Sequence, residues 1–300
     1  MTRSGGNPPT LITSALLRKW PLPRAHPTAG KEGRGDVLVV GGSAEIPGAV
    51  LLAAVGALRA GAGRLQIATA KSVASHLAVA VPEARVIGLP QTRAGELASG
   101  EHRLLGREVA AADALLVGPG MRDPAAAVEL LKHCRRTRSA AAIVVDAGAL
   151  RAFDSRKPVR MHAGPAAILT PHCGEMAALW HCTREEVQAQ PLEIARRAAA
   201  ALGVVVALKG AQTFVVGPDG TAYRNTAGNV GLGTSGSGDA LSGVIAGLSA
   251  RGATPLQAAI WGVYLHAKAG EFLARRIGAL GYLARELLAE IPRLLAEHAP

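Results

Sequence analysis

Short apolar runs alternate with longer amphipathic stretches along most of the chain. Runs that are apolar at nearly every position predict strands at residues 37–40, 65–69, 114–117, 143–146, 167–170 and 204–208. Patterns of helical period predict helices between or after them, at 48–60, 191–202, 240–250 and 255–277. Strands that are apolar on both faces are typical of parallel sheets covered by helices on each side. The alternation therefore predicts an α/β fold built from repeated βα units.

Two further patterns complete the expected fold. Residues 212–216 and 222–225 flank a Pro-Asp-Gly turn at 218–220, which predicts an antiparallel hairpin at one edge of the sheet. Leucine and isoleucine recur at helical spacing over 283–295, which predicts a final helix that covers the sheet. We expect this last helix to serve packing rather than chemistry.

The chain is long enough for one large domain with a substantial core. It has 300 residues, of which 49% are hydrophobic but only 3% aromatic, so Ala, Val, Leu and Ile must form most of that core. Residues 1–34 are rich in proline, glycine and basic side chains and are expected to form a tail or docking arm. Residues 35–300 are expected to form a single α/β domain.

Charge and cysteine content narrow the classes of function. The chain has 33 Lys and Arg against 22 Asp and Glu, but the basic residues are scattered and not interleaved with aromatic residues, so nucleic-acid binding is not expected. The positive charge does suit a polyanionic nucleotide. Three cysteines without C-x-x-C spacing indicate neither a disulfide framework nor a zinc site. Without an apolar signal segment or a membrane-length apolar run, we expect a cytoplasmic protein.

A glycine-rich segment at 228–238 is the most informative motif. It leads through Asp239 into the apolar helix 240–250. Glycines allow backbone N–H groups to turn toward one point, and a helix N-terminus adds a positive dipole end, so the segment predicts an anion hole for phosphoryl oxygens. Asp239 could then accept a proton from a hydroxyl that attacks phosphorus. The alternative is a tight turn with Asp239 as a helix cap, but the hydroxyls of Thr234, Ser235 and Ser237 favour the anion hole.

Other predicted strands end in residues of possible chemical use. The ends of parallel strands are where open α/β sheets bind ligands. These strand ends carry Gly41-Gly42-Ser43, Gly118-Pro119-Gly120, His172 and Lys209-Gly210. Taken singly, His172 is about as often a cap or surface residue as a ligand, and Lys209 about as often solvated. Neither the G-x-G-x-x-G fingerprint nor a G-x-x-x-x-G-K-[ST] loop occurs, which argues against a Rossmann dehydrogenase and a P-loop kinase.

The ordered set of these motifs resembles one enzyme family. The matching segments are Gly41 to Ser43, Pro47 to Ala49, Arg59 to Gly63, Val117 to Gly120, Val145 to Leu150, Leu169 to Glu175, Lys209-Gly210 and Gly236 to Asp239. Over roughly residues 31–275 they resemble the ADP-dependent NAD(P)H-hydrate dehydratases of the ribokinase-like superfamily. The resemblance implies a three-layer α/β/α sandwich, with a central, mostly parallel sheet and an antiparallel edge hairpin, and residues 35–300 as the catalytic domain.

The resemblance also implies a reaction and a set of site residues. The hydroxyl of a hydrated nicotinamide ring is phosphorylated from ADP, with Mg²⁺ as the expected metal, and the phosphate is eliminated to give NADH or NADPH and AMP. Asp239 takes the catalytic-base role. Gly236, Ser237 and Gly238 are assigned to the transferred phosphoryl group, Lys209, Gly210, Ala211, Gln212 and Thr213 to the adenine nucleotide, and Ala49, Gly118, Gly120, His172 and Asp239 to the hydrated dinucleotide. A homo-oligomer, with a tetramer as one form, is also expected.

The sequence departs from the family pattern at four places, and two alternative functions stay open. Glu32, Met121-Arg122, Cys173 and Ser237 replace the usual residues, and Arg122 could contact a substrate phosphate or point to water. One alternative is a vitamin kinase of the same superfamily, acting on a hydroxyethylthiazole or pyridoxal-type alcohol; Thr170-Pro171-His172 argues against it. The other is a catalytically silent nucleotide-binding regulator, which would not need Asp239.

Overall fold

The computed structural model describes residues 7–24, 30–137, 141–156 and 167–298. Its centre is a 10-stranded sheet with the order β1-β10-β9-β8-β7-β6-β5-β2-β3-β4. The strands are β1 (Thr10–Leu11), β2 (Asp36–Val40), β3 (Arg64–Ala70), β4 (Ala84–Leu89), β5 (Ala114–Val117), β6 (Ala142–Val145), β7 (Ile168–Leu169), β8 (Val205–Leu208), β9 (Thr213–Val216) and β10 (Ala222–Asn225).

Strand directions confirm the predicted sheet. Neighbouring strands are parallel from β4 to β8, whereas β8, β9 and β10 pair in antiparallel fashion. The hairpin expected at 212–225 is therefore present. Strand β4 was not predicted, because only Leu89 of its residues is fully buried and the strand lies at the sheet edge, where no continuous apolar run is required.

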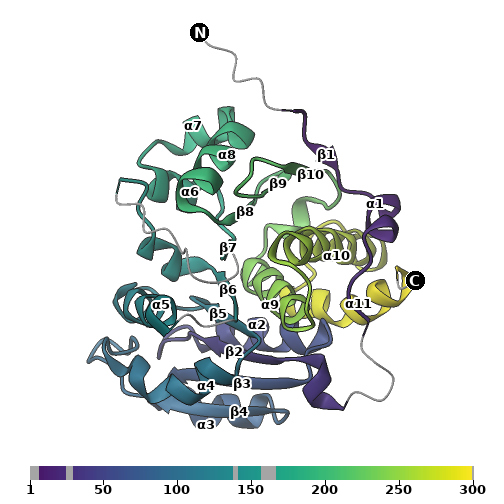
Figure 1. The fold of residues 1–300 in the computed structure, drawn as a ribbon. Coiled ribbons are helices and arrows are strands. Elements are labelled where there is room, and N and C mark those ends of the chain that lie inside the picture. The colour runs from purple at the N-terminus through teal and green to yellow at the C-terminus, as the bar shows by residue number, and fades with distance from the viewer. Residues whose placement is uncertain (1–6, 25–29, 138–140, 157–166, 299–300) are drawn as a thin grey trace.

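Helices cover both faces of the sheet (Figure 1). They are α1 (Ser14–Lys19), α2 (Pro47–Arg59), α3 (Lys71–Ala80), α4 (Gly106–Ala111), α5 (Ala125–Thr137), α6 (Cys173–Trp180), α7 (Arg184–Ala189), α8 (Pro191–Leu202), α9 (Ser237–Ala250), α10 (Pro255–Arg276) and α11 (Ala284–Glu297), with 3-10 helices η1 (Lys31–Arg34), η2 (Glu101–Leu105), η3 (Ala147–Ala152) and η4 (Val230–Leu232). The three-layer α/β/α sandwich is thus confirmed.

Two hydrophobic cores lie on opposite sides of the sheet. Helices α2, α9, α10 and α11 contribute to one core, and α4, α5, α6 and α8 contribute to the other. In β2, Val37 and Val39 point into the first core while Leu38 and Val40 point into the second. This alternation is why the strand is apolar at nearly every position.

The final helix does not lie where the sequence predicted. Helix α11 packs on α10, α2 and α9 and not directly over the strands. The reason is that α9 and α10 already cover this face, with α9 over β5 and β6 and α10 over β8 and β9. The leucine and isoleucine face of α11 therefore closes an outer layer of the first core.

The segment expected as a tail or docking arm lies on the sheet and on α10. Strand β1 pairs with β10, and Leu17 is fully buried. The Trp20 carbonyl accepts hydrogen bonds from Trp261 Nε1 at 3.0 Å and Gln257 Nε2 at 3.2 Å. Residues 7–24 thus add an edge strand and a hydrogen-bonded cover to α10. Among the described residues, no helix is both long enough and apolar enough to span a bilayer.

Helices α2 and α9 approach each other backbone to backbone. A Cβ atom at Gly243 would lie 2.1 Å from the Ala53 carbonyl oxygen, and one at Gly247 would lie 2.4 Å from that of Ala57. Only glycine allows such an approach. The contact fixes α9, the helix that begins at the glycine-rich segment.

We expect Gly243→Ala to lower the free energy of unfolding by about 1–3 kcal/mol, because the added methyl group has no space between the two helices. Urea denaturation followed by circular dichroism measures this. Gly48→Ala in α2 is the matched control, since nothing lies within 4 Å of its Cβ position. Equal stability of the two variants would contradict the packing argument.

Candidate active site

The glycine-rich segment forms the N-terminal end of α9. The N-cap of this helix is Gly236, which has a φ of 84° and receives no side-chain capping bond. A Cβ atom there would lie 2.4 Å from Leu52 Cδ1, so glycine is required on two grounds. The first-turn N–H groups of a helix have no intrahelical acceptor and can bind an anion. Asp239 lies in this first turn rather than at the N-cap, which excludes its reading as the cap.

Asp239 is an unusually basic carboxyl group. Burial raises its pKa first, repulsion by Asp146 and Glu175 raises it further, and attraction by Lys209 lowers it in part, with a net pKa of about 7. A carboxyl group with a pKa near the working pH suits general acid–base catalysis. Perturbed groups of this kind are typical of functional sites.

Lys209 lies between the carboxylate of Asp146 and the first turn of α9. Its Nζ donates to Asp146 Oδ1 at 3.1 Å, and the same oxygen accepts a bond from Thr170 Oγ1 at 2.8 Å. A Cβ atom at Gly238 would lie 3.1 Å from Nζ. Burial would lower the pKa of Lys209, but attraction by Asp146 and Glu175 outweighs it and the pKa is raised. The lysine is therefore a stable cation beside the first turn of α9 (residues 236–239), hereafter the anion-binding turn.

His172 caps α6 and is brought next to Lys209 by the sheet. Its Nδ1 accepts from the N–H groups of Gly174 at 2.9 Å and Glu175 at 3.1 Å, while Glu175 Oε2 accepts from the His172 N–H. A parallel bridge pairs residues 172 and 209. Because Nδ1 is an acceptor, the neutral ring carries its proton on Nε2. The exposed ring thus caps the helix through Nδ1, while its Nε2 lies 3.6 Å from Glu175 Oε1.

The residues predicted for the hydrated dinucleotide cluster around two strand ends. A Cβ atom at Gly120 would lie 3.2 Å from Ala49 Cβ, and one at Gly118 would lie 1.8 Å from the carbonyl oxygen of Asp146. Both glycines have positive φ, 122° for Gly118 and 73° for Gly120. Ala49 and Gly120 are therefore neighbours, and Gly118 touches the residue that pairs with Lys209.

Comparison with known proteins decides the family. The family model described as NAD(P)H-hydrate dehydratase matches residues 37–293. The chain belongs to this family. It is 49% identical over 284 residues to the ADP-dependent (S)-NAD(P)H-hydrate dehydratase of Xanthomonas campestris pv. campestris, with 95% of each chain covered.

This NAD(P)H-hydrate dehydratase family member is also similar to a longer bifunctional enzyme and to a solved structure. It is 43% identical to the bifunctional NAD(P)H-hydrate repair enzyme Nnr of Moorella thermoacetica, of which it spans about half (53%). The crystal structure of the ADP/ATP-dependent NAD(P)H-hydrate dehydratase of Bacillus subtilis, co-crystallized with ATP and Mg²⁺, matches with a TM-score of 0.81 at 29% identity, covering 99% of this chain and 100% of that one.

The predicted nucleotide segment of this family member lies beside Lys209. Gly210, Ala211 and Gln212 form an exposed turn between β8 and β9, and Thr213 begins β9 half-buried. Residues Gly210 to Gln212 are thus accessible at the same end of the strands as the anion-binding turn, because β8 ends and β9 begins there.

His266 was not predicted as a site residue. Its Nε2 shares a hydrogen bond of 3.0 Å with Ser237 Oγ, in the first turn of α9. Burial lowers the pKa of His266 to about 4, so the ring is neutral at pH 7. The residue lies in the middle of the long helix α10, and only the packing of α10 on α9 brings it to the site.

The carboxylates of this family member fit a metal that arrives with a nucleotide. Within the described ranges, no group of three or more His, Cys, Asp or Glu side chains could hold a metal ion alone. Mg²⁺ is usually bound by one or two carboxylates together with phosphates and water. Asp146 and Glu175, whose charges act on Asp239, would be the carboxylates to hold such an ion together with the phosphates.

We expect Asp239→Asn to raise the melting temperature by more at about pH 8 than at about pH 5, because the amide does not ionise. The folded-state pKa of about 7 lies above the ordinary 3.8. The folded protein therefore holds this proton more tightly than the unfolded chain, and the resulting stability is present below pH 3.8 and lost as the pH rises through about 7. Thermal denaturation without nucleotide measures the difference. The same increment at both pH values would contradict the raised pKa.

Proposed function

We propose that this protein dehydrates (S)-NAD(P)H-hydrate to NAD(P)H, with ADP as the phosphoryl donor and AMP and phosphate as products. The observation that carries the proposal is the carboxyl group of Asp239, with a pKa of about 7, in the first turn of α9. The 49% identity to an ADP-dependent (S)-NAD(P)H-hydrate dehydratase over 95% of both chains supports it. Such an enzyme is a carbon–oxygen lyase that repairs damaged nicotinamide nucleotides.

The proposed chemistry has two steps. In the first, the ring hydroxyl attacks the terminal phosphorus of ADP, a new O–P bond forms, the bond to AMP breaks, and Asp239 takes the hydroxyl proton. In the second, the C–O bond to phosphate breaks and the neighbouring ring carbon loses a proton, which restores the double bond. Phosphorylation helps because phosphate leaves more readily than hydroxide. When bound with the nucleotide, Mg²⁺ would supply positive charge to the phosphoryl oxygens.

Each group of site residues then has a role in binding. The turn formed by Gly236, Ser237 and Gly238 holds the transferred phosphoryl group. Lys209 neutralises phosphate charge, and the turn Gly210 to Thr213 lines the adenine nucleotide. Ala49, Gly118, Gly120 and His172 line the hydrated dinucleotide.

Two alternative functions have weaker support. The hydroxyethylthiazole kinase of Pyrococcus horikoshii matches with a TM-score of 0.58 at 17% identity, which supports a common fold alone. A silent regulator would have no use for a buried carboxyl group of raised pKa beside an anion-binding turn. A cytoplasmic location and a homo-oligomer, with a tetramer as one form, stay predictions from the sequence.

The function is tested by mixing the protein with hydrated NADH, Mg²⁺ and either ADP or ATP. We expect the dihydronicotinamide absorbance to recover, and faster with ADP. Recovery at an equal or higher rate with ATP would contradict the choice of donor. No recovery with either nucleotide, together with phosphorylation of hydroxyethylthiazole or a pyridoxal-type alcohol, would favour the vitamin kinase.

We expect Asp239→Asn to reduce turnover by roughly 10²- to 10⁴-fold, the range for loss of a general base, while nucleotide affinity by calorimetry is retained. The amide is similar in size but cannot accept the hydroxyl proton, whereas the anion-binding turn is unchanged. Asp219→Asn, in the turn between β9 and β10, is the control, because asparagine suits turns and this turn lies at the opposite edge of the sheet from Lys209. Near-normal turnover of the Asp239 variant would overturn the proposed mechanism.

A further inference from the structure

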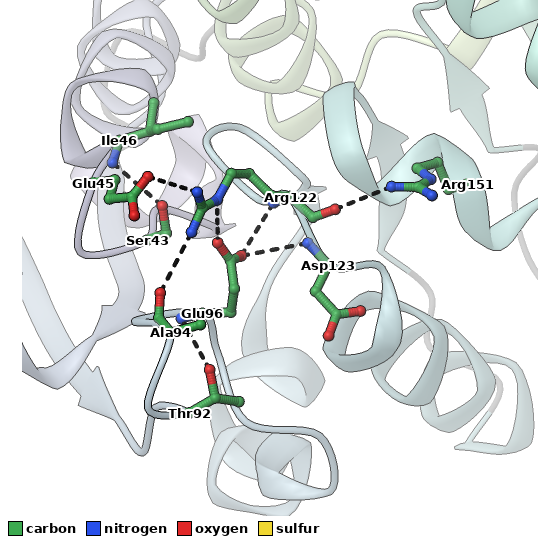
Figure 2. A network of polar contacts seen from close by, with 9 residues as sticks. All are labelled: Ser43, Glu45, Ile46, Thr92, Ala94, Glu96, Arg122, Asp123 and Arg151. Carbon is green, nitrogen blue, oxygen red and sulfur yellow. Dashed lines mark hydrogen bonds and ion pairs between the residues drawn. The ribbon is translucent and has the colours of Figure 1, made fainter.

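The guanidinium group of Arg122 is hydrogen-bonded to protein groups on all three of its nitrogens. Its Nε donates to Glu96 Oε1 at 2.6 Å, one terminal nitrogen donates to Glu45 Oε2 at 2.5 Å, and the other reaches the Ala94 carbonyl at 3.4 Å (Figure 2). The sequence left two readings open for Arg122, a contact to substrate phosphate or exposure to water. The side chain is 44% exposed, as the second reading expects, but its charged group is also paired with two carboxylates.

Glu96 receives bonds from the backbone as well as from this side chain. Its Oε2 accepts from the N–H groups of Arg122 at 3.1 Å and Asp123 at 3.4 Å. The side chain is only 7% exposed. Burial alone would raise the pKa of Glu96, but these bonds from Arg122 and Asp123 outweigh it and the pKa is lowered. Charge-assisted bonds to a buried carboxylate are stronger than neutral ones.

These contacts join three loops that follow β2, β4 and β5, at residues 41–46, 92–96 and 118–123, hereafter the rim loops. The rim loops also touch directly: the Ala44 N–H donates to the Gly95 carbonyl at 2.9 Å, and the Gly42 N–H donates to the Pro119 carbonyl at 2.7 Å. Arg151, from η3, adds a bond to the Arg122 carbonyl at 3.3 Å. Figure 2 shows Arg122 at the centre of this network.

The rim loops include residues that line the proposed substrate site. Gly118 and Gly120 belong to the third loop, and a Cβ atom at Gly120 would lie 2.5 Å from the Ile46 carbonyl oxygen of the first. A small shift of the third loop would therefore change the space in front of Ala49. Misplacing a bound substrate by a fraction of its size is costly in rate and affinity.

We propose that Arg122 and Glu96 act together as positioning residues for the hydrated dinucleotide, by holding the three rim loops in one arrangement. This rests on the proposed function. The pair does not contact the nucleotide segment at 209–213, so its effect falls on one substrate of the two.

The test compares Arg122→Ala, Glu96→Gln and the double variant in steady-state assays with hydrated NADH and ADP. In Glu96→Gln an amide NH₂ would face the N–H donors that the carboxylate now accepts from. We expect each single variant to raise KM for hydrated NADH by about ten- to a hundredfold, with KM for ADP changed by less than about twofold. The KM of the double variant for hydrated NADH should be no higher than that of the more impaired single variant, because the two side chains act as one unit.

Arg85 and Glu108 provide a matched control pair. They form an ion pair of 2.9 Å with an exposed arginine and a glutamate that is 10% exposed. Arg85 lies near the start of β4, whereas the rim loops lie at the other end of the strands. Arg85→Ala and Glu108→Gln should lower the melting temperature about as much as the rim variants, but leave both KM values unchanged.

Each of the following results would overturn the inference. A raised KM in Arg122→Ala with an unchanged KM in Glu96→Gln would mean that Arg122 binds substrate directly. Equal changes in both KM values, or the same changes in the control pair, would mean general destabilisation. No turnover by the unmodified protein would overturn the proposed function and this role with it, whereas normal turnover with unchanged KM in both rim variants would overturn this role alone.

Discussion

The ion pair between Lys209 and Asp146 is the interaction on which the site depends. Two charged groups removed from water are costly unless each satisfies the other, and here Lys209 Nζ and Thr170 Oγ1 both bind the same carboxylate oxygen. The pair leaves Asp239 as a further carboxyl group in a region already charged. Burial, together with repulsion by Asp146 and Glu175 that Lys209 offsets only in part, raises the pKa of Asp239 to about 7. Asp239 therefore binds a proton more tightly than an ordinary carboxyl group does, and near pH 7 it can both take up and release that proton.

Close backbone approach supplies the rigidity that this crowding requires. Glycines at 243 and 247 let α9 lie directly on α2, and the N-terminal turn of α9 is held at the other end by the bond from Ser237 to His266. Glycines at 118 and 120 serve differently, because their positive φ and their contacts shape loops rather than helices. A chain with few aromatic residues can therefore form a precise site from small residues packed against backbone.

Sequence patterns predicted the buried strands, the hairpin and the glycine-rich turn, because each of these depends on local residues. Strand β4 escaped prediction since an edge strand needs no apolar run, and α11 was expected over the sheet because periodicity identifies an apolar face but not its partner. The pairing of Lys209 with Asp146 joins residues 63 positions apart. It depends on strand order, which brings β6, β7 and β8 side by side. His266 and Glu96 likewise gain their partners only through packing of distant segments.

Asp146 connects the two halves of the proposed site through different atoms. Its carboxylate pairs with Lys209 on the side of the glycine-rich turn, whereas its backbone carbonyl lies where a Cβ atom of Gly118 would be, on the side of the rim loops. The N–H of Asp146 also donates to the Val117 carbonyl at 3.0 Å, which ties it to the strand that ends at Gly118. One residue at the end of β6 therefore fixes the spacing between the anion-binding turn and the rim loops. A reaction that joins a phosphoryl group to a hydroxyl needs that spacing to be constant, because the two must meet in line.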